Sequence, residues 1–175
     1  MNSNENNTVE KAVKEFSIWG QFKDTVRYKY SSFSGRASRK EYWSFAFIGF
    51  WITLLADAID TIIQFKLGIY GIVGFLVWFA LFIPNITVTI RRLHDVNRSG
   101  WYILLLYLPI GLGSSLYLFD ISIFELFNNK KHAAIVTFAL FYIIVAIELI
   151  MLYLLVKPTQ PNDNQYGPSL LNHEE

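Results

Sequence analysis

The chain has 175 residues, of which 53% are hydrophobic, 17% aromatic and only 17% charged, and its formal net charge is +1. This composition excludes an ordinary soluble globular domain and indicates a membrane protein. The sequence contains no cysteine, which excludes a disulfide framework, a thiolate nucleophile and any metal site built on cysteine.

The first 32 residues are expected to form a polar N-terminal segment with one amphipathic helix. Apolar residues recur at roughly helical spacing over residues 9–30, with basic residues between them. This pattern is typical of a helix that lies on the cytoplasmic surface of a membrane. A helix that packs on its own protein explains the pattern equally well.

Four long apolar runs predict an all-α integral membrane bundle of four transmembrane helices. Each run is close to the twenty or so residues that cross a bilayer. The membrane domain is expected over residues 33–157, followed by a cytoplasmic tail over residues 158–175. The four spans are expected at about residues 42–63, 68–90, 101–119 and 133–156.

Local signals refine these spans. Ser38 followed by Glu41 is a capping-box pattern, in which each side chain satisfies a free backbone N–H group of the other residue. A helix should therefore begin at Ser38 and lead into the first span. Pro84 interrupts the second span near its end, and Pro109 lies in the third, where a kink is expected because proline removes a helical hydrogen bond.

Basic residues are distributed unevenly between the two sides of the predicted bundle. Twelve of the fifteen lysines and arginines lie before the first span, in the polar stretch over residues 91–101 or at Lys157. The other three, Lys66, Lys130 and Lys131, lie on the opposite side. Because cytoplasmic loops are enriched in lysine and arginine, both termini and the 91–101 stretch are expected in the cytoplasm.

Three polar motifs support a family resemblance. They read GRASRKEYW over residues 35–43, IRRLHDVNRSGW over residues 90–101 and NQYGPS over residues 164–169. Together they resemble the bacterial inner-membrane family known as domain of unknown function 805. The resemblance implies a small protein that crosses the bacterial cytoplasmic (inner) membrane several times, and it implies no established reaction and no cofactor.

The basic residues near the cytoplasmic ends of the spans are candidates for binding anions or lipid headgroups. A cation at headgroup depth gains roughly 1 kcal/mol against an anionic leaflet. Most of the six are arginine, whose planar fork holds phosphate or carboxylate with two hydrogen bonds. A role in orienting the spans alone is an equally weighted alternative. The six residues are Arg36, Arg39, Lys40, Arg91, Arg92 and Arg98.

A structural polar network is expected beside these cations. We expect Asp95 to pair with Arg91 or Arg39, and His94 to form hydrogen bonds within its loop. Catalysis by His94 with Asp95 as its orienting carboxylate is a weaker alternative, because neighbouring side chains on a helix point about 100° apart. The network would hold the ends of the first three spans together. Its members are Ser38, Glu41, His94, Asp95 and Asn97.

Four polar residues fall inside the predicted spans: Asp57, Asp60, Asn85 and Glu148. A charge at this depth costs a few kcal/mol, so each carboxylate needs a partner, a proton or water. One interpretation is a path for protons or cations. The other is an Asp pair at the outer interface and an ion pair between Glu148 and Arg91 or Arg92.

The leading functional prediction is a non-enzymatic membrane module that binds anionic lipid headgroups or a partner protein through the arginine cluster. A small transporter or channel that uses the intramembrane carboxylates is the second hypothesis, and a membrane enzyme acting on lipid phosphate is the third. Glycine-rich phosphate loops and zinc or hydrolase motifs are absent from the sequence. No metal, cofactor or nucleic acid is expected, and a homo-oligomer is left open.

Overall fold

The structure is a computed structural model that describes residues 17–68, 71–118 and 130–171. Outside these residues lie residues 9–16, the first part of the predicted amphipathic helix. The described residues contain no strand, only an isolated bridge between Asn164 and Gly167. The all-helical expectation is confirmed for this part of the chain. The helices are α2 Ile18–Tyr28, α3 Arg39–Leu67, α4 Ile72–Asp95, the 3-10 turn η1 Gly100–Tyr102, α5 Ile103–Leu118 and α7 Lys130–Val156.

Three helices in the described chain are long and apolar enough to cross a membrane. They are α3, α4 and the Ile135–Val156 part of α7. The fourth apolar helix, α5, has 16 residues and is about 24 Å long at 1.5 Å per residue, against a hydrocarbon core of about 30 Å. The structure therefore supports three membrane-length helices and one shorter apolar helix, and the predicted count of four spans is not established by helix length.

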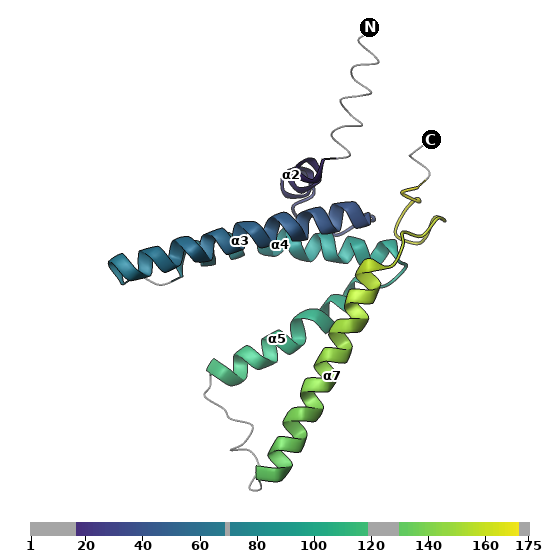
Figure 1. Ribbon diagram of the computed structural model, residues 1–175. Helices are drawn as coiled ribbons and strands as arrows, with labels where there is room; N and C mark the ends of the chain where they lie inside the picture. The colour runs from purple at the N-terminus through teal and green to yellow at the C-terminus, as the bar shows by residue number, and fades with distance from the viewer. Residues whose placement is uncertain (1–16, 69–70, 119–129, 172–175) are drawn as a thin grey trace.

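Figure 1 shows two helix pairs that meet at one end and diverge from it. One pair is α3 with α4, and the other is α5 with α7. The start of α3, the end of α4, the start of α5 and the end of α7 all lie where the pairs meet. We call this end the rim and define it as residues 35–41, 91–101 and 155–169. Helix α2 packs across α3 near the rim and appears almost end-on in a view where α3 runs across the picture.

Half of the predicted capping box forms at the start of α3. Ser38 is the N-cap, and its Oγ accepts a hydrogen bond of 3.1 Å from the backbone N–H of Glu41. The Glu41 carboxylate does not return to Ser38, because it is held by Arg91 and Lys29 instead. Helix α3 runs well past the predicted end at residue 63 and closes at Gly68, where φ is +67°.

A side chain of α3 caps the start of α4. The Asp60 carboxylate accepts hydrogen bonds from the backbone N–H groups of Val73 at 3.0 Å and Gly74 at 2.6 Å. Carboxylates are favourable here because the first N–H groups of a helix have no partner within the helix and carry partial positive charge. This contact joins α3 and α4 at the end opposite the rim.

Helix α4 continues through Pro84 and ends at Asp95. The hydroxyls of Thr87 and Thr89 donate to the carbonyl oxygens of Pro84 and Asn85, at 3.0 and 2.8 Å. The polar stretch over residues 91–101, whose many charges favour a loop, is therefore helical in its first half. The basic and acidic residues of this half belong to the last turns of α4.

Two buried clusters hold the helices together. Phe22, Ala37, Phe45 and Val88 join α2, α3 and α4. Many apolar side chains farther along the long helices are exposed, as expected where lipid replaces water as the solvent of the helix surface. The second cluster, Leu93, Ile103, Met151 and Leu154, joins α4, α5 and α7.

Candidate functional site: a buried arginine network at the rim

The Asp95 carboxylate lies between two arginines. Arg36 Nε donates to Asp95 Oδ1 at 2.9 Å, and Arg92 Nη1 donates to Asp95 Oδ2. All three side chains are at most 1% exposed. These partners differ from the expected Arg91 or Arg39. On a helix, Arg92 at position i−3 is as close to Asp95 as Arg91 at position i−4, and Arg91 pairs with Glu41 instead. One buried negative charge thus serves two positive charges.

Backbone carbonyls at the end of α7 accept two further hydrogen bonds from Arg92. Its Nε donates to Leu155 O at 3.0 Å, and its Nη2 donates to Lys157 O. The last carbonyls of a helix have no partner within the helix and carry partial negative charge. Arg92 therefore fastens α7 to α4 and shares its charge with the end of α7.

Arg36 binds the C-terminal tail in the same way. Its Nη2 donates to Gln160 O at 2.7 Å, and its Nη1 donates to Asn162 O at 3.0 Å. A guanidinium group has five donors in a fixed plane, so it serves these carbonyls and Asp95 at once. The turn before α3, the end of α4 and the tail are joined through this one side chain.

A second ion-pair cluster lies beside α2. The Glu41 carboxylate pairs with Arg91 Nη1 at 2.5 Å and with Lys29 Nζ at 3.0 Å. Thr25 Oγ1 lies 3.5 Å from the same carboxylate. Arg91 Nε and Nη2 are buried and have no partner among the described residues. This cluster joins α2 and the segment after it to α3 and α4.

His94 contacts the tail and the turn before α3. Its ring stacks on Tyr166 with ring centroids 3.8 Å apart and planes within 2°. Its Nδ1 lies 3.2 Å from Gly35 O, and Asn164 Nδ2 donates to His94 O at 2.9 Å. Within its own loop, His94 O also accepts a hydrogen bond of 3.0 Å from the backbone N–H of Asn97, while the ring of His94 contacts two other segments. None of these contacts is to the Asp95 carboxylate that the catalytic hypothesis requires.

The six candidate cations fall into two groups. Arg36, Arg91 and Arg92 are buried, and each pairs with a carboxylate of the protein. The other three, Arg39, Lys40 and Arg98, are exposed at the rim. Burial means that only the exposed group is accessible to a headgroup in this conformation. Binding of headgroups stays a prediction.

Of the predicted intramembrane residues, Asp57 and Asp60 lie close together at the start of α4, where a Cβ atom on Gly74 would be 3.0 Å from a carboxylate oxygen of each. Asp60 is buried as the cap of α4, and Asp57 on the same helix is exposed. Glu148 on α7 has no ion-pair or hydrogen-bond partner among the described residues, and the expected pair with Arg91 or Arg92 does not form. Within the described chain no three His, Asp or Glu side chains are placed to hold a metal ion.

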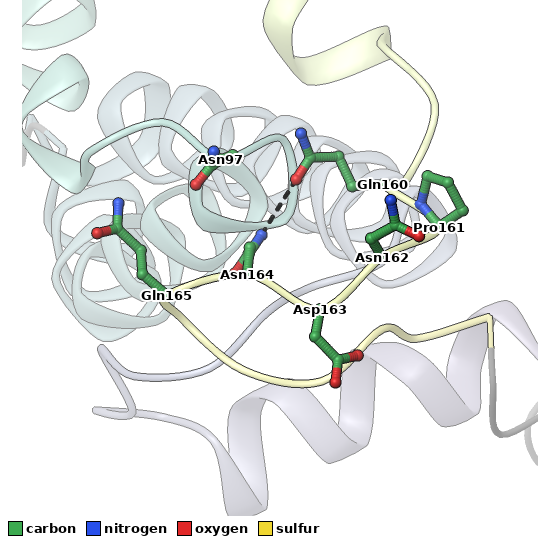
Figure 2. A pocket seen from close by; sticks show the side chains of 7 residues that line it. All are labelled: Asn97, Gln160, Pro161, Asn162, Asp163, Asn164 and Gln165. Carbon is green, nitrogen blue, oxygen red and sulfur yellow. Dashed lines mark hydrogen bonds between the residues drawn. The ribbon is translucent and has the colours of Figure 1, made fainter.

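The tail forms a polar pocket that no motif in the sequence indicates. Figure 2 shows Asn97 facing the turn over residues 160–165, with a pocket of about 530 Å³ between them. Asn164 Nδ2 lies 3.3 Å from Gln160 Oε1, and Asn97 has a left-handed φ of +56°. The residues 161–168 predict turns from their composition. The hydrogen bonds from Arg36 to this turn could not be predicted, because their acceptors are backbone carbonyls and no residue type marks them.

One family model and several curated proteins match the chain. The model of the family described as "Protein of unknown function (DUF805)" matches residues 30–168. Inner membrane protein YhaI of Escherichia coli K12 is 42% identical over 86 residues, which cover 49% of this chain and 70% of that protein. Inner membrane protein YhaH of the same strain is 38% identical over 88 residues, which cover 46% and 67%. No solved structure matches the chain.

Proposed function

This chain belongs to the DUF805 family of proteins of unknown function, and from this premise we propose that it is a non-enzymatic module which holds anionic lipid headgroups at its rim. It is a membrane protein, since its relatives are named as inner membrane proteins and three of its described helices have membrane length.

The proposed topology has four crossings, with the rim and both termini in the cytoplasm. Alternating helix directions support it, because α3 and α5 leave the rim whereas α4 and α7 return to it. Helix α5 together with η1 provides 19 residues, Gly100 to Leu118. A short hydrophobic helix is accommodated by local thinning of the bilayer at modest cost. The excess of basic residues at the rim supports its cytoplasmic position.

The observation that carries the proposal is an apolar groove in which Lys40 is the one charged lining residue. The groove has a volume of about 370 Å³ and is lined by Ile18, Lys40, Trp43, Ser44 and Phe47. A phospholipid likewise combines a charged phosphate at the membrane interface with hydrocarbon chains beneath it. Lys40 therefore suits the phosphate, and the two aromatic side chains suit the chains of the lipid.

Further exposed cations lie at the rim and on α2. Arg39 and Arg98 are exposed at the rim, and Lys23 and Arg27 are exposed on α2. Each contributes roughly 1 kcal/mol near an anionic leaflet. The buried arginines contribute indirectly, because they fix the helix ends that carry these side chains.

Neither of the other hypotheses gains a specific observation. A role for Asp60 in transport would compete with the role of this carboxylate as the cap of α4. An enzyme that uses Asp95 to orient a base competes with the two arginines that occupy its carboxylate. The headgroup proposal uses side chains that are exposed.

Lipid retention tests the proposal. The purified chain is placed in a mixed detergent with equal phosphatidylglycerol and phosphatidylcholine, and bound lipid is counted by native mass spectrometry. We expect a preference for phosphatidylglycerol that falls about tenfold or more when Arg39, Lys40 and Arg98 are all changed to Gln. Lys66→Gln removes an exposed cation at the other end of α3 and should leave the preference unchanged. Equal preference in all three proteins would overturn the proposal.

A further inference from the structure

A third pocket lies between α3, α4 and α5, separate from the rim cations, and has a volume of about 400 Å³. This volume is in the range of small-molecule sites. No charged side chain is among the residues that line it. Half of its lining is aromatic and comes from all three helices: Tyr42, Phe45, Phe50, Trp78, Phe82 and Tyr107.

Two hydrogen-bond donors on this lining have no acceptor in the described chain. Asn85 is exposed, and only its Oδ1 is used, by Thr89 Oγ1 at 3.4 Å. Tyr107 has no hydrogen bond from its hydroxyl among the described residues. Asn85 lies ten residues before the end of α4, about 15 Å from the rim along the helix. Water is scarce at that depth, so a donor without an acceptor is costly there.

We propose that this pocket binds the head of a quinone-type lipid, which is a flat conjugated ring with carbonyl oxygens and an apolar chain. The carbonyl oxygens provide the acceptors that Asn85 and Tyr107 need. The aromatic side chains provide faces and edges on which a flat ring packs. The uncharged lining suits a neutral head. Because the two helix pairs diverge from the rim (Figure 1), the apolar chain extends toward the bilayer.

An ester carbonyl of a diacylglycerol shares the acceptor chemistry but has no ring. The aromatic lining favours the quinone, since hydrocarbon chains pack equally well on aliphatic side chains. Phe82 and Tyr107 already pack edge-to-face across α4 and α5 with centroids 6.3 Å apart. A ring inserted beside this pair extends an existing aromatic arrangement.

Fluorescence quenching tests the site on the full-length chain in lipid nanodiscs. A benzoquinone with a decyl chain is titrated, and we expect saturable quenching that is lost in Trp78→Phe, although the chain keeps its four other tryptophans. The double variant Asn85→Leu with Tyr107→Phe should bind at least about tenfold more weakly, because both donors to the head are removed. Tyr142→Phe changes an exposed tyrosine on α7 and should bind as the unchanged protein does.

Three results would overturn the proposal. The first is quenching that rises with quinone without saturation. The second is equal quenching in Trp78→Phe. The third is displacement of the quinone by an equal concentration of diacylglycerol, which would assign the pocket to acyl esters. If the double variant does not fold, Tyr107→Phe alone decides, since it removes one oxygen atom and should still weaken binding severalfold.

Discussion

Arg36 and Asp95 are 59 positions apart in the sequence, and their side chains form an ion pair of 2.9 Å that is almost completely buried. The pair joins the turn before α3 to the end of α4. Burying two charges is expensive unless both are paired and fully hydrogen-bonded. Here Arg92 and four carbonyl oxygens of α7 and the tail supply those bonds, so the rim depends on all of its parts together.

Neutralising the shared carboxylate should be strongly destabilising. Asp95→Asn leaves Arg36 and Arg92 buried without a counter-charge, and we expect a loss of about 3–5 kcal/mol in the free energy of unfolding. Asp57→Asn changes an exposed aspartate and should cost less than about 1 kcal/mol. Unfolding of both variants in mixed micelles by a denaturing detergent gives the comparison, and equal losses would contradict the structural role of Asp95.

Lysine should replace Arg91 with a smaller loss of stability than it replaces Arg36. Arg36→Lys loses the planar fork that serves Asp95, Gln160 and Asn162, and should cost roughly 2 kcal/mol or more. Arg91→Lys keeps its single ion pair with Glu41 and removes two buried N–H groups that have no partner. Its cost should stay within about 1 kcal/mol. The ranking is read from thermal unfolding midpoints, and a reversed order would refute it.

A methyl group at Gly74 should disturb the cap of α4. A Cβ atom there would lie 3.0 Å from Asp57 Oδ1 and 3.0 Å from Asp60 Oδ2. We expect Gly74→Ala to lose about 1 kcal/mol through the weakened cap. Gly49→Ala is the matched control, since its Cβ would meet only a Leu81 carbon at 4.0 Å, and it should be neutral or stabilising because alanine favours helix. Thermal unfolding of the two variants decides.

The stack of Tyr166 on His94 should hold the tail at the rim. Tyr166→Ala removes the stack, and we expect cleavage within residues 158–171 by a soluble protease to become about two- to tenfold faster. Tyr166→Phe keeps the ring and should be cleaved at the original rate. Slower cleavage or no change in the alanine variant would show that the tail is held by its carbonyl contacts alone.

Local features of the fold could be predicted from the sequence. Ser38 is recognisable as an N-cap because the capping pattern involves only neighbouring residues. The long apolar runs give α3, α4 and α7 because hydrocarbon requires a continuous helix. The end of α4 differs from the expected end near residue 90, because arginines and a His–Asp pair indicate a loop. The helix continues to Asp95, since these side chains form ion pairs and hydrogen bonds with other segments.

The partners of the rim arginines could not be predicted in the same way. Arg36 and Arg92 bind carbonyl oxygens of the tail and of α7, and carbonyls exist at every position of a chain. The choice of Asp95 partners depends on which face of α4 meets the turn before α3, and this is a tertiary property. The three motifs that support the family resemblance nevertheless meet here, with Arg36, Asp95 and Tyr166 in one rim.

The side of the membrane on which the rim lies tests the proposed function most directly. Because the chain has no cysteine, Asn162→Cys at the rim and Lys66→Cys at the other end of α3 each introduce a single thiol at an exposed position. A maleimide that does not cross membranes is applied to spheroplasts before and after lysis. We predict that Lys66→Cys is labelled in intact spheroplasts and Asn162→Cys only after lysis. Labelling of Asn162→Cys from outside would place the rim away from the anionic inner leaflet and contradict the proposed headgroup site.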